Sequence, residues 1–149
     1  MNDCGARFVI LPYLKNSGIN GFLQWKSEGP SIAINSRRKS HDLFLFTVFH
    51  EIKHILQGQN TKFILDLDKS NFDDELEIDA NEFARDMLIP PNEYQQFISC
   101  GKFDEAEIIK FSQKISVHPG IIVGRLHYEK YIEYRELKNL KVRCAGLIE

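Results

Sequence analysis

The pattern of apolar and polar positions changes character after the first quarter of the chain. Three short apolar runs come first, at residues 7–12, 22–26 and 31–35, and the sequences between them are rich in glycine, with Pro12 and Pro30 at run boundaries. Runs of this length bounded by turn residues are typical of β-strands. The pattern therefore predicts three short strands, which tight turns would arrange as an antiparallel meander.

A long apolar helix is predicted next, over residues 42–57, because this segment has few polar breaks and contains neither proline nor glycine. Ser40 or Asp42 can cap its start, and Gly58 can end it. On a helical wheel one broad side is formed by apolar residues, namely Phe44, Leu45, Val48, Phe49, Ile52, Ile55 and Leu56. A helix that is apolar almost all round belongs in the centre of a domain.

The rest of the chain has mainly helical periodicity. Helices are predicted over residues 75–89, 92–100, 104–115 and 120–131, with prolines 90 and 91 ending the first and Asp104 capping the third. Residues 62–66 fit either a short strand or an extended loop. A strand-rich beginning followed by helices predicts an α+β class, with a short antiparallel N-terminal sheet packed on a mainly helical domain.

Composition narrows the class of protein without naming a function. With 149 residues, we expect a single domain over residues 1–149. The net charge of -2 gives no basic excess for direct nucleic-acid binding, and no stretch suggests a membrane span or a signal peptide. Three scattered cysteines (4, 100 and 144) form no Cys-x-x-Cys pair, which predicts a reduced, cytoplasmic setting.

The candidate metal-binding and catalytic residues lie in the predicted helix over residues 42–57. His50 and His54 are four residues apart, so their imidazoles share one face and can hold one metal ion. Glu51 lies about 100° around the helix from His50, where it can take a proton from a metal-bound water. The alternative is a pair of buried histidines satisfied by hydrogen bonds. Three specified residues inside an apolar helix favour the metal site.

A catalytic zinc site needs a third protein ligand and a water. Residue 60 is Asn, so the pattern that would supply a third histidine is missing, and the candidates are Asp73, Glu77 and Asp79. Helical phase places Glu77 at the edge of the apolar stripe, Asp79 on the opposite face and Asp73 at the frayed start. We therefore predict Glu77 as the ligand; its alternative role is to favour the dipole at the helix start.

Three segments in order, residues 46–56, 77–90 and 117–126, resemble the ImmA/IrrE family of zinc metallopeptidases. The first reads Phe-Thr-Val-Phe-His-Glu-Ile-Lys-His-Ile-Leu. The resemblance implies a zincin-like fold and one Zn²⁺ per chain, held by His50, His54 and Glu77, with Glu51 as general base. It also implies cleavage, in active members, of a helix-turn-helix repressor. The similarity extends to the C-terminal peptidase-like part of HigA-type antitoxins and phage-type regulators. We expect no preceding helix-turn-helix domain, because strand-like sequence begins at Arg7.

Two positions qualify this resemblance. The family usually has Gly where this chain has Lys53, which lies about 60° from His50 on the helical wheel and could narrow a cleft. His118 matches a recurrent family position and could donate a hydrogen bond to an oxyanion, or could simply fix the start of a helix. Nearby, Gly120 and Gly124 suggest close helix packing.

The leading hypothesis is a zinc-dependent endopeptidase whose substrate, a protein segment, binds extended along the edge of the sheet. The partner would be a protein, such as a helix-turn-helix repressor. The alternative is a non-catalytic or vestigial zinc-binding module in a toxin–antitoxin or phage regulatory system. Peptidase activity separates the two hypotheses.

Overall fold

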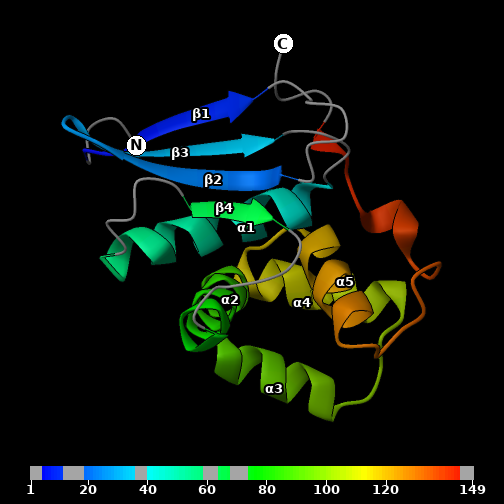
Figure 1. Cartoon of the computed structure of the whole chain (residues 1–149). Coiled ribbons are helices and arrows are strands. Elements are labelled where there is room, and N and C mark those ends of the chain that lie inside the picture. Colours follow the sequence, from blue (N-terminus) through cyan, green and yellow to red (C-terminus); the bar gives the residue numbers. More distant parts are fainter. Residues whose placement is uncertain (1–4, 12–18, 36–39, 59–63, 68–73, 145–149) are drawn as a thin grey trace.

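A four-stranded sheet lies over a group of helices in the computed structural model, which describes residues 5–11, 19–35, 40–58, 64–67 and 74–144 (Figure 1). The strands are β1 (Arg7–Leu11), β2 (Ile19–Lys26), β3 (Gly29–Asn35) and β4 (Ile64–Leu67), in the spatial order β1-β3-β2-β4. The α+β class is therefore confirmed, and residues 64–67 form a strand.

The predicted antiparallel meander is wrong for β1. Strand β2 is antiparallel to both β3 and β4, but β1 runs parallel to β3 and does not pair with β2. The interior position suits β3 because Ile32, Ala33 and Ile34 are all buried there. A strand buried along consecutive residues gains most from a neighbour on each side, and the sequence pattern gave no sign of this. Strand β2 begins at Ile19, three residues before the apolar run at 22–26.

Within the part of the chain that the structure describes, five α-helices follow the first three strands, and their positions agree with the hydrophobic pattern to within a few residues. They are α1 (His41–Leu56), α2 (Asp74–Leu88), α3 (Pro91–Ser99), α4 (Glu105–Ile115) and α5 (Pro119–Tyr128), followed by a short 3-10 helix, η2 (Lys138–Leu140). Asp104 caps α4 by accepting a hydrogen bond from the backbone N–H of Glu107. Ser40 occupies the N-cap position of α1 without a side-chain capping bond.

Helix α1 lies between the sheet and the other helices, as its apolar sequence predicts (Figure 1). On the sheet side, Leu23, Ile32 and Ile34 are fully buried, and each such side chain contributes about 1.5–3 kcal/mol. The α1 side chains packed against them are Phe44, Val48, Ile52 and Ile55. Leu56, which the helical wheel placed in the core, is 67% exposed because it ends the helix.

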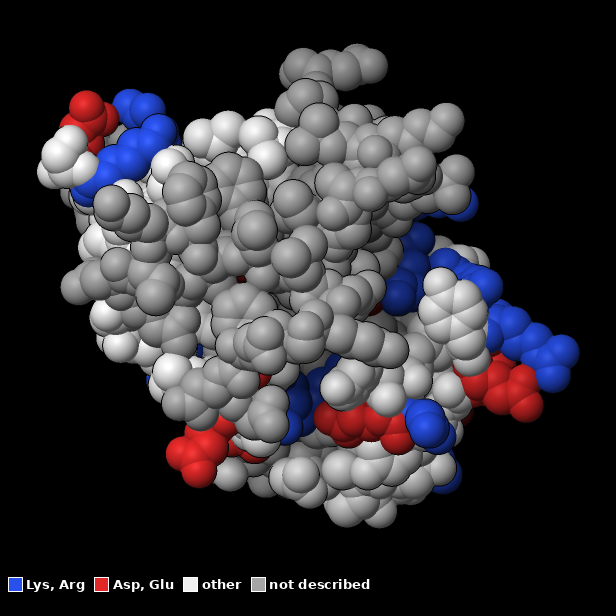
Figure 2. All heavy atoms as spheres, viewed as in Figure 1, with Lys and Arg blue, Asp and Glu red and all other residues white. Residues whose placement is uncertain are grey.

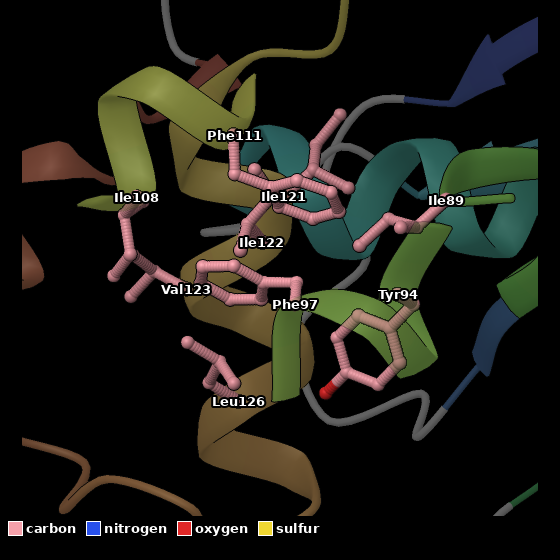
Figure 3. Close-up of a cluster of buried hydrophobic side chains, with 9 residues drawn as sticks. All are labelled: Ile89, Tyr94, Phe97, Ile108, Phe111, Ile121, Ile122, Val123 and Leu126. Carbon is pink, nitrogen blue, oxygen red and sulfur yellow. The ribbon is translucent and has the colours of Figure 1, made fainter. Parts of the chain in front are cut away.

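A second hydrophobic core joins the helices below α1 (Figure 3). Its buried members come from the residue that follows α2 and from α3, α4 and α5, and they are Ile89, Tyr94, Phe97, Ile108, Phe111, Ile121, Ile122, Val123 and Leu126. Leu45 of α1 packs against this cluster as well. Helix α1 therefore contacts both cores, which fixes its position in the fold.

Charges are interspersed on the face seen in Figure 2, where blue and red side chains of the described residues lie next to one another. Among the helices of the described residues, none combines the length and the apolar character needed to cross a membrane.

Glycines let α5 approach its neighbours closely, as the sequence suggested. A Cβ atom on Gly124 would lie 2.8 Å from Cγ of Asp42, whose carboxylate is 2.7 Å from Nζ of Lys141 in a mostly buried ion pair. A Cβ atom on Gly120 would lie 2.7 Å from the backbone oxygen of Leu140. Both positions are therefore filled by neighbouring atoms.

The Gly124→Ala substitution tests this close approach. Helix propensity alone favours alanine by about 1 kcal/mol, whereas overpacking against Asp42 costs about 1–3 kcal/mol. We expect overpacking to dominate, so that the free energy of unfolding falls in a urea titration. An unchanged or higher free energy of unfolding would contradict the packing described for α5.

Candidate metal centre

Helices α1 and α2 pack against each other and bring three predicted ligands together. His50 and His54, one turn apart on α1, are 8% and 1% exposed. Their Nε2 atoms lie 3.0 Å apart, with ring centroids separated by 4.6 Å. Both imidazoles therefore point to one place, as the four-residue spacing predicts.

Glu77 of α2 completes the group. Its Oε2 lies 3.4 Å from Nε2 of His50, and its Oε1 lies 3.2 Å from Nε2 of His54. One ligand atom from each of the three residues falls within a space 4.8 Å across. The choice of Glu77 over Asp79 from helical phase therefore agrees with the geometry. Asp73, the third candidate, lies outside the described residues.

The outer nitrogens of both imidazoles face amide oxygens. Nδ1 of His54 is 3.0 Å from Oε1 of Gln57, and Nδ1 of His50 is 3.1 Å from Oδ1 of Asn81. An amide oxygen only accepts hydrogen bonds, so these contacts favour a proton on each Nδ1. A neutral imidazole protonated there presents its lone pair on Nε2, as a metal ligand of this site must.

This donor set fits a catalytic zinc ion. Two neutral imidazole nitrogens and a carboxylate converge, which is one of the ligand sets of zinc peptidases and leaves a fourth position for water. In this largely buried space the carboxylate of Glu77 is costly without a positively charged partner. The residues could therefore hold a divalent metal ion.

Charges and hydrogen bonds shift the pKa values of both Glu77 and His54. In the metal-free protein an imidazole that carries a proton on Nε2 donates to Glu77. Such hydrogen bonds from His50 and then from His54 lower the pKa of Glu77 from 4.5 to about 2, so this side chain is a carboxylate at neutral pH. Burial is the largest influence on the pKa of His54 and acts to lower it. The hydrogen bond and charge of Glu77, with smaller contributions from Glu51 and Gln57, outweigh burial, so the pKa of His54 lies above 6.5.

Glu51 lies next to His50 on α1 and is only 1% exposed. Its negative charge contributes to raising the pKa of His54, which places the carboxylate near the ligand group. This position agrees with the prediction of a carboxylate that flanks a metal ion.

His118 lies elsewhere. It is the N-cap residue of α5, where its Nδ1 accepts a hydrogen bond from the backbone N–H of Gly120 at 3.1 Å, and its ring contacts His41. His41 precedes His50 by nine residues, or about 13 Å along α1. The helix-start role is therefore confirmed, and the oxyanion role stays a prediction that this placement does not favour.

Asp79 and Lys53 form a contact that the sequence analysis did not identify. Asp79 is exposed, as helical phase predicted, but its Oδ2 lies 3.0 Å from Nζ of Lys53 and 3.0 Å from Nε2 of Gln57. The Lys53 ammonium also lies over the ring of Phe83. Lys53 therefore has partners on α2, and its charge is directed to that helix.

Gln57 and Asn81 are the functional candidates that the sequence analysis missed. A weak signal existed, since Gln57 follows His54 by three residues and Asn81 follows Glu77 by four, both helical spacings.

The raised pKa of His54 predicts how pH affects the metal-free protein. Its stabilising effect is complete below the unfolded pKa of 6.5 and is lost as pH rises through the higher folded value. Glu77→Gln removes the partner that raises this pKa. Both proteins are treated with chelator, and their thermal midpoints are compared. We expect the unmodified protein to have the higher midpoint, and the difference from Glu77→Gln to be larger at about pH 5.5 than at about pH 8. A difference in thermal midpoint that grows with pH would contradict a raised pKa of His54.

Comparison with protein families agrees with this geometry. The family model Peptidase_M78, described as the IrrE N-terminal-like domain, matches residues 5–127, a span that contains the two histidines, Glu51 and Glu77. A search of curated proteins finds no match. Because the family model covers most of the chain, the protein belongs to the IrrE N-terminal-like domain family of metallopeptidase-like proteins.

Proposed function

We propose that this domain is a zinc-dependent endopeptidase that cleaves a regulatory protein. The observation that carries the proposal is the convergence of the Nε2 atoms of His50 and His54 on the carboxylate of Glu77, within a space 4.8 Å across. Membership of a metallopeptidase-like family supports the same chemistry.

His50, His54 and Glu77 would hold the ion, and each residue has a defined part in doing so. A bound zinc ion would polarise the scissile carbonyl and lower the pKa of a water molecule to about 7. Both histidines are buried away from bulk water, and the amide oxygens that face their Nδ1 atoms favour a lone pair on each Nε2. The low pKa of Glu77 keeps its carboxylate charged over the whole neutral range.

Glu51 would move the proton. Its carboxylate takes a proton from the attacking water and gives it to the leaving amine nitrogen, so the peptide bond is broken with no net change at Glu51. A buried carboxylate beside the ligand histidines suits this part, since removal from bulk water strengthens its interaction with a developing positive charge.

Strand β4 offers a place for an extended substrate. It lies at the end of the strand order, and its described pairing is with β2 alone. It also comes between α1 and α2 in the chain, the two helices that carry the ligands. A peptide added to this edge would pair through its backbone, which accepts many sequences. We infer that the substrate is a protein segment, and propose a cytoplasmic helix-turn-helix repressor as its source.

Metal content is the first test of this proposal. We expect the purified protein to bind about one zinc ion per chain in elemental analysis. Chelator competition should show that His50→Ala, His54→Ala and Glu77→Ala each weaken binding by more than the roughly 10- to 100-fold typical of changes to residues behind the ligands. Glu51→Gln should retain zinc. Absence of any divalent metal after zinc is supplied would rule the proposal out.

Cleavage is the second test. The zinc-loaded protein is incubated with the helix-turn-helix protein encoded beside it, and fragments are identified by mass spectrometry. We expect discrete fragments, and a rate at least about 100-fold lower for Glu51→Gln because the general base is lost. Glu82→Gln, a change at an exposed glutamate of α2, is the matched control and should cleave normally.

A zinc-loaded, folded protein that leaves this partner and unfolded casein intact would contradict the endopeptidase. That result would instead support the non-catalytic zinc-binding module.

A further inference from the structure

Gln57 is held at both ends of its amide group. It occupies the C-cap position of α1, where its Oε1 faces Nδ1 of His54 at 3.0 Å. Its Nε2 donates to the backbone oxygen of Leu76 at 3.1 Å and to Oδ2 of Asp79 at 3.0 Å. The two acceptors on the nitrogen side fix which end of the amide faces the histidine.

The opposite amide orientation would be unfavourable at three places. Oε1 would then face the Leu76 carbonyl and the Asp79 carboxylate, which are both acceptors, and the NH₂ group would face Nδ1 of His54. His54 would then have to carry its proton on Nε2, so that Nδ1 could accept the hydrogen bond from the NH₂ group. The nitrogen that faces Glu77 would then carry a proton and could not bind a metal ion.

Asp79 is itself held in place. Its Oδ2 lies 3.0 Å from the ammonium of Lys53, one turn before Gln57 on α1, and Lys53 also lies over the ring of Phe83 on α2. Both helices therefore contribute to the orientation of Gln57. The contacts form a continuous chain from Lys53 through Asp79 and Gln57 to His54.

We propose that Gln57 is a positioning residue for the metal centre: it keeps His54 in the tautomer that presents a lone pair on Nε2, and Asp79 with Lys53 keeps Gln57 in the orientation this requires. The inference rests on the proposed function because it concerns the same metal centre. The tautomer is nevertheless a property of the metal-free protein and can be measured without zinc or activity.

The test uses the full chain and compares Gln57→Met with the unmodified protein. Methionine has a similar length and no amide, so packing at the end of α1 is retained while the acceptor for Nδ1 is lost. Imidazole nitrogen-15 chemical shifts of the metal-free protein, at a pH where both histidines are neutral, report the tautomer of His54. Chelator competition then gives the zinc affinity of the same samples.

Glu77 faces Nε2 and competes for the proton of neutral His54, so we expect the fraction protonated on Nδ1 to be larger in the unmodified protein than in Gln57→Met. Zinc affinity should fall by about 10- to 100-fold, as for other residues that orient metal ligands. Asp79→Ala leaves Gln57 one of its two acceptors and should have a smaller effect in the same direction.

Two variants give internal controls. Asn81→Leu removes the partner of His50 and should change the tautomer of that residue while leaving His54 unchanged. Gln95→Leu, at an exposed glutamine of α3, should change neither histidine.

An unchanged His54 tautomer and an unchanged zinc affinity in folded Gln57→Met would overturn the inference. The proposed function fails separately, if the unmodified protein does not bind zinc; the nitrogen-15 measurement still decides the role of Gln57 in that case.

Discussion

The contact between α1 and α2 is the constraint on which the candidate site depends. Each helix alone has polar side chains that are costly to bury: two histidines and a glutamate on α1, and Glu77 at the apolar edge of α2. Packed together, they leave an imidazole pair facing a carboxylate, and the Lys53–Asp79 ion pair joins the same helices nearby. A metal ion would turn this arrangement from a cost into a source of stability, because ligand groups that converge only in the folded state couple binding to folding.

Contacts on several sides of α1 fix its position and therefore its contact with α2. One side of the helix packs under β2 and β3, and Leu45 reaches the core formed by the C-terminal helices. The close approach of α5 at Gly124 and the buried Asp42–Lys141 pair hold the beginning of α1, whereas Gln57 and its neighbours hold the end. Metal centres need ligands fixed to within a fraction of an ångström, and contacts at both ends of one helix meet that need.

Local periodicity predicted the elements and the ligand group because both depend on spacing within one helix. The His50 and His54 pair and the phase of Glu77 follow from about 100° per residue. Sheet order did not follow, since β1 pairs with β3 through contacts distant in sequence, which alternation within a strand does not encode. Gln57, Asn81 and the partners of Asp79 were missed for a similar reason. A polar residue on a helix has many possible partners, and only the packing of α1 against α2 selects one.

We propose that a zinc ion is held by two histidines and a carboxylate. X-ray absorption at the zinc edge of the zinc-loaded protein identifies the ligand atoms and so tests this ligand set. We expect the nearest coordination shell to contain nitrogen and oxygen alone, at about 2.0–2.2 Å, with the outer-ring scattering of two imidazoles. A sulfur contribution at about 2.3 Å, or a shell without imidazole scattering, would contradict it.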